Sequence, residues 1–250
     1  MTGLEAMLPA EVSPLVASGL MGISFLGSFI TAAFGIGGGV VVLAVLASLL
    51  PPAALIPVHG FVQLGSNAGR TLIMRDHIAL PILGSFVIGA IIGVAIGGVI
   101  VVDLPPAIIQ IAVGCFVLWT IFFKPPGFLR RAAWLAGGFS SILTMFFGAT
   151  GPFVAGYVKA QGFDRMVHVA THGACMTVQH GLKVFAFGLL GFAFGPYLVL
   201  IIGMIAFGFI GTLAGRKVLT KINEQAFKLA LNGILIALSL RLIWAGVTEL

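Results

Sequence analysis

The chain has 250 residues, of which 60% are hydrophobic and 8% are charged, and its formal net charge is +6. Soluble domains carry about 25% charged residues, so this composition excludes an ordinary soluble fold. The basic residues lie in short segments between apolar runs, which indicates membrane topology rather than nucleic-acid binding.

Ten apolar segments follow one another along the chain and predict an all-α, polytopic membrane protein. They cover residues 14–33, 40–50, 54–73, 78–101, 106–123, 132–147, 152–161, 167–190, 193–215 and 227–247. Proline pairs at 51–52, 105–106 and 125–126 predict helix boundaries. Two segments, 40–50 and 152–161, are too short to cross a bilayer, which needs about 20 helical residues.

A glycine-containing pattern occurs twice, 113 residues apart, and each copy directly precedes one of the two short segments. The first copy, Phe34–Gly39, reads FGIGGG and is followed by His59 and Gly60. The second, residues 147–152, reads FGATGP and is followed by His172 and Gly173. Glycine breaks at corresponding positions of two halves of a membrane protein are the best sequence indication of a transporter's binding site.

The positions of the basic clusters predict how the two halves are arranged. If the clusters near 70–75, 124–131, 159–165 and 216–228 all face the cytoplasm, each break is the turn of a re-entrant hairpin. Each half, 1–123 and 124–250, then consists of one broken hairpin and three transmembrane helices. Together they form one integral membrane domain of two inverted repeats, with seven or eight spans if hairpin arms are counted. In the alternative arrangement, both broken helices cross fully and basic clusters lie on both sides.

Polar side chains recur at helical spacing along the segment that follows each break. The candidate substrate contacts are His59, Gln63, Asn67, His172, Gln179, His180 and Lys183. Polar groups deep in a membrane segment usually face a cavity or the interior of the bundle. The same groups could instead only hold helices together. Arg70 could be an interfacial anchor or a ligand, and the Lys183 side chain could extend to the membrane surface.

The breaks also predict the charge of the ligand. An interrupted helix leaves backbone N–H groups unpaired at a new N-terminus, where the helix dipole favours an anion. The candidate donors are Gly37, Gly38, Gly39, Thr150 and Gly151. In the alternative interpretation, these glycines only allow tight turns between packed helices.

The motifs of most enzymes are absent from the sequence. There is no nucleophile–base pair, no paired carboxylate and no cluster with metal-ligand spacing. We therefore predict no catalytic residue, no cofactor and no metal. Histidine titrates near neutral pH, so His59, His172 or His180 could couple proton movement to anion movement.

The FGIGGG break, its second copy and the polar segments after each resemble the sulfite exporter TauE/SafE family of membrane transporters over nearly the whole chain. The resemblance implies transport of a small sulfur-containing or organic anion, such as sulfite, sulfoacetate or a related sulfonate, across the cytoplasmic membrane. Thiosulfate-importing relatives use membrane cysteines, but Cys115 and Cys175 do not occupy corresponding positions in the two halves.

Together these features predict a secondary carrier in the cell (inner) membrane, with a small anion and the lipid bilayer as its partners. Export is the expected direction. A channel-like anion pore and a non-transporting scaffold or accessory subunit are the alternatives. The glycine face formed by Gly89, Gly93 and Gly97 would permit close helix packing, which is compatible with a homodimer.

Overall fold

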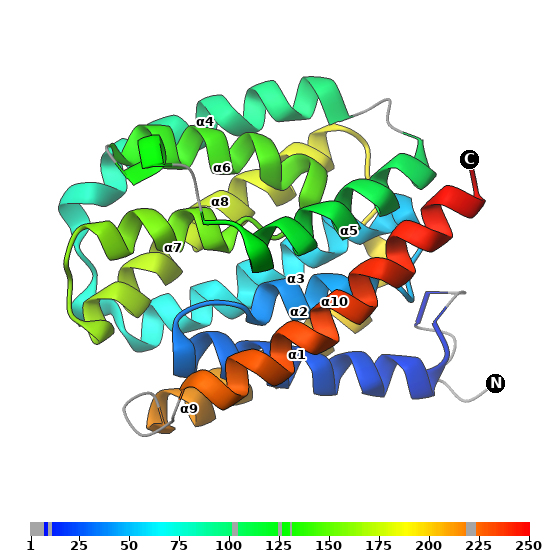
Figure 1. Ribbon diagram of the computed structural model, residues 1–250, viewed down its shortest axis with the longest axis horizontal. Helices are drawn as coiled ribbons and strands as arrows, with labels where there is room; N and C mark the ends of the chain where they lie inside the picture. The colour runs from blue at the N-terminus through cyan, green and yellow to red at the C-terminus, as the bar shows by residue number, and fades with distance from the viewer. Residues whose placement is uncertain (1–7, 10–11, 102–104, 125–126, 131, 219–223) are drawn as a thin grey trace.

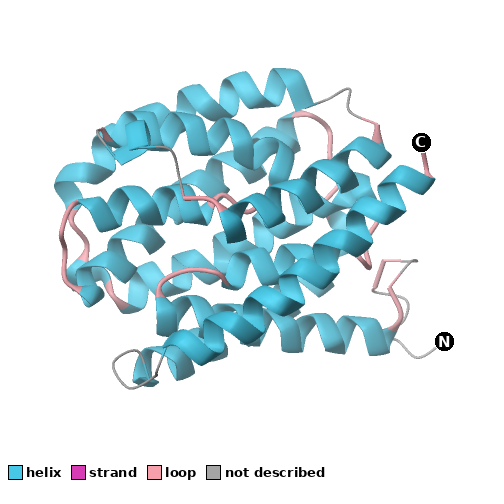
Figure 2. Ribbon diagram, in the orientation of Figure 1, coloured by secondary structure: helices cyan, strands magenta, loops and turns pink. Residues whose placement is uncertain are grey.

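The computed structural model describes residues 8–9, 12–101, 105–124, 127–130, 132–218 and 224–250, and these residues form ten α-helices and no strand (Figures 1 and 2). The helices are α1 (Pro14–Phe34), α2 (Gly38–Ala47), α3 (Pro52–Ile73), α4 (Leu80–Val101), α5 (Pro106–Phe122), α6 (Ala133–Phe147), α7 (Gly151–Ala160), α8 (Arg165–Leu189), α9 (Leu198–Val218) and α10 (Glu224–Thr248). Short 3₁₀ turns lie at Arg75–His77, Gly127–Arg130 and Gly195–Tyr197. Each helix corresponds to one predicted apolar segment.

Local sequence signals account for many of the helix boundaries. Pro51 and Pro105 are the N-cap residues of α3 and α5, each followed by a proline whose fixed φ suits the first helical turn. The side chain of Asp164 accepts a hydrogen bond of 2.9 Å from the Val167 backbone and caps α8. The predicted boundary at residues 125–126 lies outside the described residues.

Both breaks begin with a glycine that has a positive φ angle. Gly35 (φ +84°) ends α1 and Gly148 (φ +79°) ends α6, and these two residues are 113 positions apart. Residues with a Cβ rarely adopt this conformation, so glycine allows the chain to leave each helix sharply. The short helices α2 and α7 start within three residues of these turns.

The helices pack in pairs that correspond between the two halves. α1 packs on α9 and α6 packs on α4, while α3 packs on α8 and α5 packs on α10. In the α3–α8 pair, Gly60 lies against Lys183 whereas Arg70 lies against Gly173, so the two helices run antiparallel.

Glycines bring the backbones of the α4–α6 and α1–α9 pairs into close contact. A Cβ on Gly93 would lie 2.2 Å from the Gly138 carbonyl oxygen, and one on Gly211 would lie 2.1 Å from the Phe25 carbonyl oxygen. Gly89 and Gly97 face α6 in the same way. The glycine face that we considered for a homodimer is therefore occupied within the chain and gives no support to one.

The outer helices present apolar side chains outward. Ile88 and Ile92 on α4, Ile202 on α9 and Trp244 on α10 are all more than half exposed. Among the described residues, three helical segments are long and apolar enough to cross a membrane: Pro14–Phe34, Leu80–Val101 and Gly195–Val218. The helices α3 and α8 are also long enough, with 22 and 25 residues, but their polar faces lower their hydropathy and these faces are buried.

The two ends of the molecule differ in charge. In Figure 1 the start of α1 and the end of α10 lie at the right, whereas the C-terminal ends of α3, α7 and α9 lie at the left. Arg75, Lys159, Arg165 and Lys217 follow or end these helices, so the left-hand end carries the basic residues. We call it the basic end.

We expect Gly93→Ala to lower the free energy of unfolding by about 1–3 kcal/mol, because its Cβ would collide with backbone that cannot move aside. Thermal unfolding in detergent micelles measures the effect. Gly84→Ala is the matched control on α4, since no atom lies within 4 Å of its Cβ position. Equal melting temperatures for the two variants would contradict the close α4–α6 packing.

Candidate functional site

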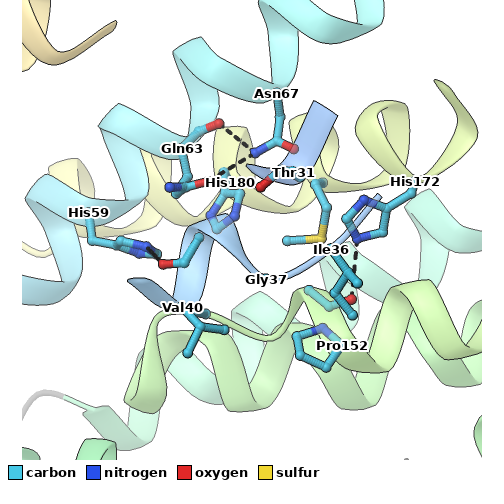
Figure 3. Close-up of a pocket in the computed structure, with 14 residues that line it drawn as sticks. Thr31, Ile36, Gly37, Val40, His59, Gln63, Asn67, Pro152, His172 and His180 are labelled. Atoms are coloured by element: carbon cyan, nitrogen blue, oxygen red, sulfur yellow. Dashed lines mark hydrogen bonds between the residues drawn. The ribbon is translucent and has the colours of Figure 1, made fainter. Parts of the chain in front are cut away.

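A small pocket lies between the two glycine breaks, and Figure 3 shows most of the side chains around it. Its volume is about 30 Å³. The residues that line it are Thr31, Ile36, Gly37, Gly39, Val40, His59, Gln63, Asn67, Ala149, Gly151, Pro152, Met176, His172 and His180. They come from both halves of the chain, so neither half forms the pocket alone.

One histidine from each half is fixed by the glycine break of its own half. His59 Nε2 lies 2.9 Å from the Gly39 carbonyl oxygen, and His172 Nε2 lies 3.2 Å from the Gly151 carbonyl oxygen. Figure 3 marks both bonds. A carbonyl oxygen only accepts, so Nε2 carries the proton in each ring.

The second nitrogen of each histidine in the pocket is buried and has no hydrogen-bond partner. This holds for Nδ1 of His59, His172 and His180. The rings of His59 and His180 lie edge to face, with their centroids 6.0 Å apart. Because Nε2 of His59 and His172 is already a donor, Nδ1 of these rings can donate to a ligand only when the ring is protonated and cationic.

Two cationic side chains are buried beside the pocket, at positions 113 residues apart. Arg70 is 1% exposed and Lys183 is 0% exposed. Arg70 Nη2 donates to Asn67 Oδ1, and Lys183 Nζ donates to the Gly148 carbonyl oxygen at 3.0 Å and to Thr144 Oγ1 at 3.3 Å. These contacts exclude both an interfacial position for Arg70 and an extended, surface-seeking Lys183.

The glycine of each His-Gly pair makes room for the cation of the other half. A Cβ on Gly60 would lie 2.6 Å from Lys183 Cε, and a Cβ on Gly173 would lie 2.9 Å from Arg70 Nε. The repeated His-Gly pair therefore combines a pocket histidine with a space for a buried cation.

Eight of the twelve predicted contact residues line the pocket, and four do not. Gly38 packs against α1, where its Cβ would lie 1.7 Å from the Gly27 carbonyl oxygen. Gln179 Nε2 donates to Ser140 and Ser141 Oγ at 2.8 and 3.0 Å, and its Oε1 accepts from Thr150 Oγ1 at 3.2 Å. These bonds use both N–H groups of the Gln179 amide. Gln179, Thr150 and Lys183 are not among the residues that line the pocket.

Sequence reasoning missed six lining residues: Thr31, Ile36, Val40, Ala149, Pro152 and Met176. Ile36 and Ala149 lie inside the breaks, so closeness to the glycines could have indicated them. Met176 lies four residues after His172, so helical spacing already put it on the same face, although it was not among the predicted contacts. Val40 looks like an ordinary core residue in the sequence, and no local signal separates it from its neighbours.

The two helix N-termini at the pocket are not equivalent. Neither N-cap residue, Gly37 or Thr150, caps its helix with a side-chain hydrogen bond. The first turn of α2 thus keeps unpaired N–H groups next to the pocket. In α7, Pro152 occupies the position that corresponds to Gly39 and has no N–H, so α7 offers fewer donors than α2.

Comparison with family models identifies the architecture that holds this site. The model described as Sulfite exporter TauE/SafE matches residues 20–242, which is most of the chain and includes both breaks and both polar helices. The chain belongs to the TauE/SafE family. No match was found among curated proteins or among solved structures.

Membership in TauE/SafE agrees with the apolar outer surface and makes the chain a multi-pass membrane protein of a transporter family. The resemblance seen in the sequence is thereby confirmed, as is the all-helical, polytopic fold. In this TauE/SafE chain, the pocket between the breaks is the candidate substrate site.

Gln179→Ala should lower the free energy of unfolding by roughly 1–3 kcal/mol, because it leaves buried hydroxyl groups without partners. The Michaelis constant for a transported anion should stay unchanged, since Gln179 does not line the pocket. Melting temperature and transport kinetics together check this. Gln161→Ala, at an exposed position, is the matched control. A raised KM in a stably folded Gln179→Ala protein would mean that Gln179 contacts the transported anion after all.

Proposed function

We propose that this protein is a secondary transporter that moves a small sulfur-containing or organic anion, such as sulfite, sulfoacetate or a related sulfonate, through the pocket between the glycine breaks. Two buried basic side chains with only neutral partners carry this proposal. The partners of Arg70 and Lys183 are an amide, a hydroxyl and a carbonyl oxygen. Among the described side chains, the carboxylates of Asp76, Asp164 and Glu249 are all exposed.

A buried charge without a counter-charge costs several kcal/mol. Arginine stays protonated in proteins, so Arg70 cannot lose this charge by giving up its proton. Its Nε is buried and lacks a hydrogen-bond partner. A bound anion would offset the charge, and the unpaired N–H groups at the start of α2, beside the pocket, would add donors.

The pocket volume favours a carrier over an open pore. About 30 Å³ holds roughly two water molecules, and residues of both breaks line this space. Substrate entry therefore requires the two breaks to separate, as happens when one repeat rocks against the other.

Several packing features support an inverted relationship between the repeats 1–123 and 124–250. The corresponding helices α3 and α8 run antiparallel. The same holds for α5 and α10, because Gly114 lies against Ile243 while Gly246 lies against Ile111. Repeats related by an axis in the membrane plane have this property, since their corresponding helices cross the bilayer in opposite directions.

The basic end supports the orientation in the membrane. Short loops rich in lysine and arginine stay on the cytoplasmic side, so we place the basic end in the cytoplasm and the protein in the cell (inner) membrane. Export is then movement from the basic end to the end where α1 starts and α10 ends.

Proteoliposomes loaded with sulfite, sulfoacetate, thiosulfate or a dicarboxylate test the proposal. The wild type should move at least one sulfur anion saturably, and His172→Ala should lose most of this activity because His172 lines the pocket. His77→Ala, at an exposed position, should transport normally. The proposed function would be contradicted if folded protein moves none of these anions, or if His172→Ala transports as well as the wild type. Movement without saturation would indicate a pore.

Transport should accelerate as the pH falls from about 8 to about 5, the range in which histidine titrates. Protonation turns Nδ1 of His59 or His172 into a donor for the anion. Arg70, Lys183, His168 and His180 are the other titratable groups near these rings, and a bound anion would stabilise a protonated ring. His172→Gln should reduce the pH dependence whereas His77→Gln should keep it. A pH-independent rate would exclude proton coupling.

A further inference from the structure

A second, larger cavity opens at the basic end of the molecule. Its volume is about 610 Å³, and it lies among the end of α1, the end of α5, α7 and the start of α8. Four basic side chains line it: Lys124, Lys159, Arg165 and His168. No acidic residue lines it. We call this cavity the basic vestibule.

The positive charges of the basic vestibule are held at different depths. Lys124 and Lys159 are exposed, whereas Arg165 and His168 are half-buried. Arg165 Nη2 donates to the Ala33 carbonyl oxygen at 2.8 Å, which fixes the guanidinium to the end of α1. The nearby Asp164 carboxylate accepts from the Val167 N–H as the cap of α8.

The basic vestibule and the central pocket share part of one wall. Ile36, from the first break, and Pro152, from the second, line both cavities. Figure 3 shows these two side chains at one edge of the pocket. A small displacement of the breaks would join the two spaces.

The opposite end of the molecule has a corresponding cavity without charge. Its volume is about 310 Å³, and none of its lining residues is charged. Its lining residues Pro52 and Ile56 lie 113 positions before Arg165 and Val169, which line the basic vestibule. The two halves therefore form related cavities, and of these two only the basic vestibule has basic lining residues that would attract anions.

We propose that the basic vestibule collects the transported anion and delivers it to the central pocket past Ile36 and Pro152. The inference rests on the proposed function and adds a one-sided entrance to it. A cleft lined by one sign of charge and low-dielectric walls raises the local concentration of the opposite ion. The cavity at the other end has no charged residue among its described lining, so anions are captured at low concentration from the basic end, which is where export would start if that end is cytoplasmic.

The test uses Lys124→Gln/Lys159→Gln in membrane vesicles whose basic end faces the assay buffer, with sulfite or whichever panel anion the wild type moves. At low ionic strength the KM should rise on the order of tenfold while Vmax stays unchanged. At about 1 M salt, where the Debye length is roughly 3 Å, the two proteins should have the same KM. Arg75→Gln/Lys217→Gln is the matched control, because it removes two exposed basic residues near the same end, neither of which lines the cavity.

Four outcomes would overturn the inference. An unchanged KM, or an equal rise in the control, would mean that these side chains do not collect the anion. A loss confined to Vmax would give them a structural role. A difference that disappears when anionic lipids are omitted would assign the cavity to a lipid headgroup. A wild type that moves no anion would instead contradict the proposed function itself, so the two failures are distinguishable.

Discussion

The architecture depends on burying two basic side chains that no described carboxylate compensates. Arg70 and Lys183 lie on antiparallel helices, and each fits only because the facing helix has a glycine at the point of contact. Neutral oxygen atoms solvate them in part. The small pocket between the breaks lies beside both side chains, so an anion bound there would be stabilised by their positive potential.

Glycine has two separate physical roles in this fold. At the breaks, Gly35 and Gly148 supply the positive φ angle that ends a helix in the interior of the bundle. In the helix pairs, Gly93 and Gly211 remove the side chain so that backbones can touch. The first role creates helix ends beside the pocket, and the second holds the helices α1, α4, α6 and α9 in tight pairs around it.

The two halves have the same order of helices and breaks but differ in side chains at corresponding positions. Pro152 removes a backbone donor where the first half has Gly39, and Arg165 adds a charge where the first half has Pro52. The first difference leaves α2 with more unpaired backbone donors beside the pocket than α7. The second makes one entrance basic and leaves the other apolar. A pseudo-symmetric scaffold can rock between two conformations. Such departures from symmetry give its two ends different charge.

The sequence alone determined the helices, their proline boundaries, the two breaks, the polar faces and the TauE/SafE family, because periodicity, glycine and proline act within a few residues along the chain. It also identified the pocket histidines, which follow the breaks at a fixed distance. Only the tertiary structure decided that Gln179 and Lys183 do not line the pocket, that Val40 does, and that basic residues from separate segments surround one vestibule. These outcomes depend on how each helix is rotated and shifted relative to its neighbours. The spacing of residues within a single helix does not determine that arrangement.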